Sequence, residues 1–257
     1  MSIELPDTGD VHPVGRRDTR RGHRPRRGLI DPGAMSSGPF LIGGGREPEQ
    51  LLPTHRPFLA ACAGGPIVCL VADEGDGIDA ERWRSALRDS ADGAPPEVEV
   101  VVLSAARPLA DADVAGAAGI YVAGGLTPLY AELLAGWTPP AGVPYAGFSA
   151  GAAVAAGQAI VGGWRTADGL AVCPEDAGED LDVITVMPGL GLVPYAVDVH
   201  AAQWGTLGRL IHAVESGLVA EGWALDEGTL LVDGEIHGVG AGWHVADGGR
   251  VRRVTPR

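Results

Sequence analysis

From residue 38 onward, short apolar runs alternate with segments whose apolar positions recur every three or four residues. The runs are FLIGGG, PIVCLVAD, VEVVVLS, IYVAGG and PYAGFS. Most are continuous in Val, Ile and Leu, which is typical of parallel strands buried on both faces. Helices are predicted between them near 48–62, 79–91 and 127–136, and from 150 to 156. The pattern predicts an α/β fold, a mostly parallel sheet with helices on both faces.

The last third of the chain has a different pattern. Further strands are predicted here, with turns at an Asp-Gly and a Gly-Gly pair: LDVITVM, GWALD, GTLLVDG, EIHGVGAGWHVA and RVRRVTP. Such pairs favour tight hairpins. A helix is predicted near 201–216, and C-terminal β-hairpins are therefore expected to follow the parallel sheet.

The first 34 residues lack apolar periodicity and are rich in Arg, Pro, Gly and Asp. Such a segment cannot offset the entropy lost on ordering, so a disordered Arg-rich tail is predicted at 1–34, before a single domain at 35–257. Two roles stay open for the tail. It is either a solvated extension or an arm that binds nucleic acid or directs targeting.

Composition and charge narrow the function classes. Of 257 residues, 46% are hydrophobic, enough for a core, and no stretch approaches the ~18 apolar residues of a membrane span. The net charge is −14; the tail carries seven Arg and five acids, and removing this +2 leaves −16 on residues 35–257. We expect no binding to nucleic acid or to membranes. The chain has no Lys, which excludes Schiff-base and phosphate-loop lysines.

The three cysteines, Cys62, Cys69 and Cys173, are odd in number and form no pattern. No apolar signal-peptide stretch follows Met1. A reduced, cytoplasmic setting is therefore expected. The His and Cys spacings form no ligand cluster, so no metal and no cofactor are predicted.

The strongest chemical signal is GFSAGA, in which Gly147 and Gly151 flank Ser149. The motif follows a predicted strand and precedes a small-residue helix, at the edge where parallel strands place their chemistry. Small neighbours permit the sharp turn that exposes a nucleophilic hydroxyl. The helix would also direct its positive end at a developing oxyanion. The alternative is that Ser149 only caps that helix.

A serine nucleophile needs a base and an acid that orients it. His200 lies where the run VPYAVDVH meets a predicted helix, and the acid is either Asp198 or Glu227. The alternatives are that His200 is a capping residue and that Asp226–Gly228 is only a turn. The other histidines lie in the tail, in helices or in hairpins: His12, His23, His55, His212, His237 and His244.

Four blocks give the chain a family resemblance. IYVAGGLTPLYAEL, GFSAGAAVAAG, PGLGLVPYAVDVHAAQWGTLGRL and ALDEGTLLVDG follow in order. They resemble the peptidase E and cyanophycinase family of serine peptidases over roughly Pro39 to Val254. The resemblance implies a class I glutamine amidotransferase-like, flavodoxin-type fold and a homodimer. It implies Ser149 as nucleophile, His200 as base, Glu227 as acid, and the Gly125 and Ala150 N–H groups as the oxyanion hole.

The chain differs from the family at the positions that recognise substrate. Val199 stands where cyanophycinases have Gln, Trp204 and Thr206 stand where they have arginines, and Leu126 replaces an Asn of peptidase E relatives. Arg209 remains and suits a carboxylate, so Asp198 and Arg209 are expected to bind substrate. The alternative is that Arg209 pairs with Glu215 or Asp198.

The leading hypothesis is a serine hydrolase acting on a small peptide or amide, with aspartyl and isoaspartyl peptides as candidates. A glutaminase would need Cys in place of Ser149. One alternative is an α/β-hydrolase esterase, whose order Ser, acid, His would use Asp182 or Asp198 and then His237 or His244. The other is a binding protein that keeps the fold without turnover.

Overall fold

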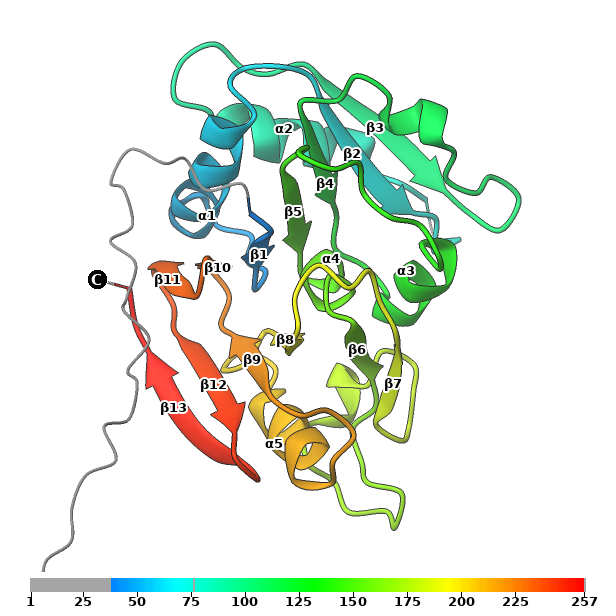
Figure 1. Cartoon of the computed structure of the whole chain (residues 1–257), viewed down its shortest axis with the longest axis vertical. Helices are drawn as coiled ribbons and strands as arrows, with labels where there is room; N and C mark the ends of the chain where they lie inside the picture. The colour runs from blue at the N-terminus through cyan, green and yellow to red at the C-terminus, as the bar shows by residue number, and fades with distance from the viewer. Residues whose placement is uncertain (1–37, 76, 257) are drawn as a thin grey trace, which may run out of the picture. The chain divides into compact units, whose positions relative to one another are not determined.

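The computed structural model describes residues 38–75 and 77–256, so the predicted tail at 1–34 lies outside the described residues. Seven strands form the largest sheet (Figure 1). They are β1 (Phe40–Ile42), β2 (Ile67–Ala72), β3 (Val98–Leu103), β4 (Gly119–Val122), β5 (Tyr145–Phe148), β10 (Thr229–Val232) and β11 (Glu235–Gly238).

The order of this sheet is β11-β10-β1-β5-β4-β2-β3. Five neighbouring strands run parallel to one another: β1, β5, β4, β2 and β3. The strands β10 and β11 are antiparallel and lie at one edge of the sheet. The mostly parallel α/β sheet expected from the apolar runs is confirmed. The Asp-Gly hairpin is also present: Asp233 and Gly234 have φ of 50° and 76° between β10 and β11, as a primed turn requires.

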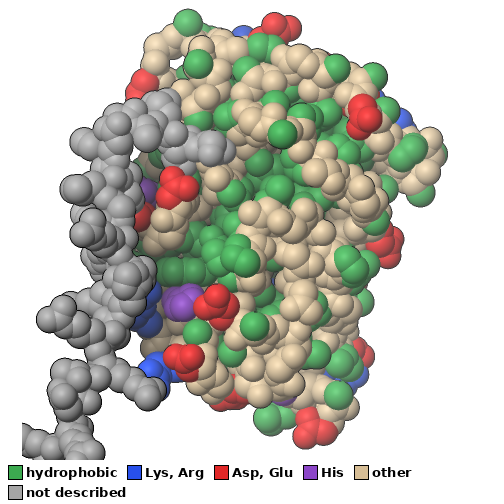
Figure 2. All heavy atoms as spheres, viewed as in Figure 1, with side chains coloured by type: hydrophobic (Ala, Val, Ile, Leu, Met, Phe, Trp, Pro, Cys, Tyr) green, Lys and Arg blue, Asp and Glu red, His purple; other side chains and the backbone are tan. Residues whose placement is uncertain are grey.

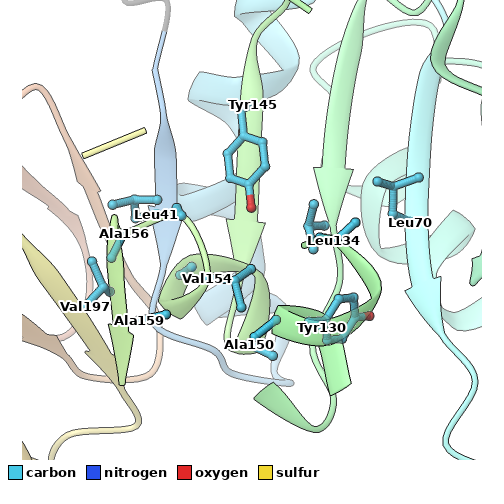
Figure 3. Close-up of a cluster of buried hydrophobic side chains, with 14 of the residues drawn as sticks. Leu41, Leu70, Tyr130, Leu134, Tyr145, Ala150, Val154, Ala156, Ala159 and Val197 are labelled. Carbon is cyan, nitrogen blue, oxygen red and sulfur yellow. The ribbon is translucent and has the colours of Figure 1, made fainter. Parts of the chain in front are cut away.

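Alternation along the strands divides the core between the two faces of this sheet. On β1, Phe40 and Ile42 join the core under α1 (Pro48–Ala61) and α2 (Ala80–Asp89). Leu41 points to the opposite face, where α3 (Thr127–Leu133) and α4 (Ala150–Ala153) pack (Figure 3). Helices therefore cover both faces. The parallel strands β1, β2, β4 and β5 are buried as their unbroken apolar runs predict, whereas the edge strand β3 is only partly buried.

A second sheet holds β8 (Ala196–Val199), β9 (Gly222–Leu225), β12 (Gly242–Ala246) and β13 (Arg250–Val254), in the order β13-β12-β9-β8. β8 and β9 are parallel, and the other pairs are antiparallel. α5 (Leu207–Glu215) contributes Leu210 and Ala213 to a separate apolar cluster with this sheet. The Gly-Gly pair expected in a hairpin lies between β12 and β13.

Some elements differ from those that the sequence predicts. α4 ends at Ala153, and α5 begins at Leu207, since a turn occupies 201–204. The segment QAIVG forms β6 (Gln158–Gly162), which pairs with β7 (Thr185–Pro188). Its small residues continue an Ala- and Gly-rich stretch, so its pattern gives no strand signal. Short 3₁₀ helices lie at Asp111–Val114 and Glu175–Ala177.

The two larger sheets meet at the carboxyl ends of their parallel strands. Ser149 follows β5, Gly124 lies just after β4, and His200 follows β8. The His200 N–H donates to the Gly43 carbonyl after β1, at 3.2 Å. This junction brings distant segments together at one edge, where open α/β sheets bind their ligands. No helix in the described part of the chain has the length and apolar character to cross a membrane.

Candidate functional site

Ser149 lies in a strained turn between β5 and α4. Its φ of 53° and ψ of −112° are unfavourable for a residue with a side chain. A Cβ at Gly147 would lie 2.2 Å from the Gly151 carbonyl oxygen, and one at Gly151 would lie 2.2 Å from that of Val122. Both glycines are thus required by close backbone approach. The Ser149 side chain makes no capping hydrogen bond, so it does not cap α4.

The Ser149 side chain contacts His200, which contacts Glu227. Ser149 Oγ lies 2.8 Å from His200 Nε2, and His200 Nδ1 lies 2.8 Å from Glu227 Oε1. Ser149 and His200 are buried, whereas the Glu227 side chain is 21% exposed. This is the geometry that the ordered sequence blocks predict, with Glu227 rather than Asp198 on the imidazole.

These contacts define which ring nitrogen of His200 carries the hydrogen. The Glu227 carboxylate accepts from Nδ1–H, which leaves Nε2 to accept from the Ser149 hydroxyl. Burial lowers the pKa of His200 below 6.5, while the hydrogen bond and charge of Glu227 oppose that shift. The imidazole is therefore neutral near pH 7 and able to take a proton.

Small residues make room for the imidazole. A Cβ at Gly44 would lie 2.2 Å from His200 Cε1, and the φ of Gly44 is +103°. The Gly44 carbonyl accepts from the Gly228 N–H at 2.8 Å, next to Glu227. The Glu227 N–H donates to Gln203 Oε1 at 2.9 Å. The segments that carry the base and the acid are thus tied to each other and to the loop after β1.

Asp226, next to Glu227, has a structural role. Its carboxylate accepts from the backbone N–H groups of Ala202 and Ala241, at 3.1 and 3.0 Å. It also accepts from the Trp243 indole N–H at 3.0 Å. These three bonds fix the turn from which Glu227 reaches the imidazole.

Asp198 and Arg209 bind each other rather than facing the cavity. Two hydrogen bonds of 2.9 and 2.7 Å join them, and both side chains are almost fully buried. Arg209 also donates to the carbonyls of Ala177 and Gly163. The geometry therefore runs against the expectation that they bind substrate. The alternative pairing with Asp198 is the one present, because a buried guanidinium needs a buried carboxylate.

The turn after β4 lies beside Ser149. A Cβ at Gly124 would lie 3.2 Å from the Ser149 Cβ. Within residues 38–75 and 77–256, the Gly125 and Ala150 N–H groups donate to no protein acceptor. These are the two N–H groups that the family resemblance assigns to an oxyanion hole.

Two carboxylates from distant loops hold this turn. Glu74 Oε1 accepts from the Leu126 N–H at 2.7 Å, and Glu179 Oε2 accepts from the Thr127 N–H at 3.0 Å. Burial raises the pKa of Glu179 to about 7, although the Thr127 N–H and Arg209 oppose the shift. A carboxylate that titrates near neutral pH therefore contacts the first residue of α3.

A cavity of about 650 Å³ opens at this junction. Ser149, His200, Glu227 and Gly125 line it. Its wall also carries charged side chains of both signs: Arg46, Arg82, Glu74, Asp79, Asp176, Glu179 and Asp180. Neither arginine forms an ion pair with another described residue. Acidic side chains are also scattered around the visible face of the molecule (Figure 2).

The other described histidines do not line this cavity. His55 is buried, and its Nε2 lies 2.9 Å from the Tyr121 hydroxyl oxygen. Burial lowers the pKa of His55 to about 4. His244 contacts Glu221, while Asp182 pairs with Arg165. The order Ser, acid, His of an α/β-hydrolase is therefore not assembled around Ser149.

Two of the three cysteines are buried thiols. Burial raises the pKa of Cys62 to about 12 and also raises that of Cys69, so both thiols stay protonated. Over the described ranges, no three His, Cys, Asp or Glu side chains are placed to hold a metal ion.

Comparison with known proteins adds no assignment. A scan against family models gives no match, and a search of curated proteins gives none either. The resemblance to peptidase E and cyanophycinases stays a prediction. The sequence contains no signal for Glu74 or Glu179, because each acts through a contact with a residue distant in the chain. The Gly-rich run 43–45 places Gly44 at the carboxyl edge of the sheet, but does not show that it lies against His200.

Proposed function

We propose that this protein is a serine hydrolase that cleaves a peptide or amide bond in a small substrate. The observation that carries the proposal is the pair of 2.8 Å contacts joining Ser149 to His200 and His200 to Glu227. A serine hydroxyl is a weak nucleophile unless a base takes its proton and a third group orients that base. The strained backbone of Ser149 is a further cost that a structural serine would not require.

In the proposed reaction, Ser149 Oγ attacks the substrate carbonyl carbon while His200 Nε2 takes the hydroxyl proton. The Gly125 and Ala150 N–H groups stabilise the oxyanion, a kind of contact that contributes about 3–4 kcal/mol per donor. His200 then gives its proton to the leaving amine. Water, deprotonated by His200, then attacks the acyl carbon. The bond from that carbon to Ser149 Oγ breaks as His200 returns the proton to Oγ, and Glu227 stabilises the imidazolium in both steps.

We propose in addition that the chain is a relative of peptidase E and the cyanophycinases, with their flavodoxin-type fold. Three features support this. The sheet has five parallel strands, the serine follows its central strand β5, and the order along the chain is Ser, His, Glu. A homodimer and a cytoplasmic location belong to the same proposal.

The charges of the cavity wall support a small zwitterionic peptide as substrate. Arg46 and Arg82 are guanidinium groups without an ion-pair partner among the described residues, and guanidinium suits a substrate carboxylate. Asp176 and Asp180 lie on the same wall and suit an ammonium group. Aspartyl and isoaspartyl dipeptides carry both charges and are the first candidates.

A hydrolysis assay tests the function. Dipeptides with and without a side-chain carboxylate are incubated with the full chain, and free amino acids are measured. Ser149→Ala and His200→Ala should each lower kcat by 10³-fold or more. His244→Ala is the matched control and should keep full activity, because His244 lies away from the cavity. Equal turnover by Ser149→Ala would refute the proposal, and binding without turnover would favour a binding protein.

A further inference from the structure

Trp204 is stacked on the imidazole of His200. The two ring centroids are 3.9 Å apart, and the ring planes are inclined by 12°. The Trp204 side chain lies on the turn between β8 and α5, remains 41% exposed, and borders the same cavity as Ser149. One side of the indole is therefore against His200, and part of the rest faces the space that a substrate would fill.

The turn that carries Trp204 is held at several points. The Trp204 N–H donates to the His200 carbonyl at 2.8 Å, and the Thr206 hydroxyl donates to the Val199 carbonyl at 2.6 Å. Gln203 accepts from the Glu227 N–H. The indole and the imidazole are thus fixed relative to each other by the backbone that joins them.

An indole face interacts differently with the two charge states of the imidazole. Its negative π surface attracts a cation placed over it and has little preference for a neutral ring. His200 is neutral at rest and becomes an imidazolium when it takes the Ser149 proton. The attraction therefore strengthens as that charge develops, which is what favours a transition state over the bound substrate. Burial acts in the opposite direction, since it penalises the imidazolium.

We propose that Trp204 is a positioning residue for the base: its indole keeps the imidazole aligned between Ser149 and Glu227 and stabilises the imidazolium. This inference rests on the proposed function, because it concerns the same histidine. Glu227, Asp198 and Arg209 are the charged groups that act on the imidazole. They are unchanged in variants of Trp204. A fall in the pKa of His200 in those variants therefore reports the lost π face, because any loss of burial would raise that pKa.

The first test is the titration of His200, followed by NMR on the full chain with labelled histidine and assigned with His200→Ala. Trp204→Leu keeps apolar cover on the imidazole but removes the π face, and should lower its pKa by about 0.5–1 unit. Trp204→Phe restores a π face and should recover most of that shift. Leu170→Ala, an exposed residue outside the cavity, is the control and should leave the titration unchanged.

The second test is kinetic. Trp204→Leu should lower kcat about five- to twentyfold and move the acid limb of the pH profile to lower pH, and Trp204→Phe should recover most of kcat. Trp204→Met gives the same comparison should the leucine variant fail to fold. Equal titrations in the tryptophan, phenylalanine and leucine proteins would overturn the inference even if kcat falls. A wild-type protein without turnover would instead refute the proposed function, while the titration still tests the stacking.

Discussion

At the residue scale, the site depends on side chains that are absent as much as on those present. Gly44, Gly147 and Gly151 each lie where a Cβ would come within 2.2 Å of a neighbouring atom. Gly147 and Gly151 allow the turn that carries Ser149, and Gly44 leaves room for the imidazole. The strained conformations of Ser149 and His200, with φ of 53° and 55°, persist only because this packing supports them.

Gly44→Ala tests this spacing. The added methyl group would meet His200 Cε1 and displace the ring, so kcat/KM should fall about 100-fold while the protein stays folded. Gly136→Ala is the matched control, because Gly136 also has a positive φ, +75°, but has open space around it. Both variants place an alanine at a positive φ. Similar kinetic losses in the two would show that strain, rather than contact with His200, causes the effect. Hydrolysis rates and circular dichroism make the comparison.

At the scale of elements, the buried pair Asp198–Arg209 ties three parts of the molecule. Asp198 is on β8, Arg209 is on α5, and Arg209 also holds the carbonyl of Ala177 before the loop of Glu179. Glu179 in turn holds the N–H at the start of α3. A chain of contacts therefore runs from the strand that ends at the base to the turn that follows β4.

Glu179 makes the stability of this arrangement depend on pH. Its pKa is about 7 in the folded protein against an ordinary 4.5, so folding favours the protonated form. The stability that the protonated Glu179 side chain contributes is fully present below pH 4.5 and is lost as the pH rises through 7. Glutamine at this position does not titrate. The free energy of unfolding of Glu179→Gln minus that of wild type should therefore increase by about 1–3 kcal/mol as the pH rises from 4.5 to 8.

Urea unfolding at several pH values measures this difference. The exposed Glu175→Gln on the neighbouring 3₁₀ helix controls for the loss of one negative charge. A difference between Glu179→Gln and wild type that is constant over this range would contradict the raised pKa.

At the scale of the whole molecule, the sequence predicts the parallel sheet and the candidate triad better than the walls of the cavity. The unbroken apolar runs around β1 and β2 indicate buried parallel strands, and Gly147 and Gly151 indicate the turn of Ser149. By contrast, Glu74 and Glu179 each reach their N–H partner across 52 positions of the chain. Arg209 pairs with Asp198, one of the two partners that the sequence leaves open, and local pattern does not show that both side chains are buried and turned away from the cavity. Such contacts depend on how the two larger sheets meet.

Covalent labelling of the full chain with a small fluorophosphonate tests the central claim most directly. Ser149 Oγ should displace fluoride from phosphorus, giving one adduct that mass spectrometry locates on Ser149. Labelling should be absent in Ser149→Ala and at least about 100-fold slower in His200→Ala, since the base no longer takes the hydroxyl proton. An adduct elsewhere, equal labelling of Ser149→Ala, or a folded wild-type protein that does not react would contradict the assignment of Ser149 as the nucleophile.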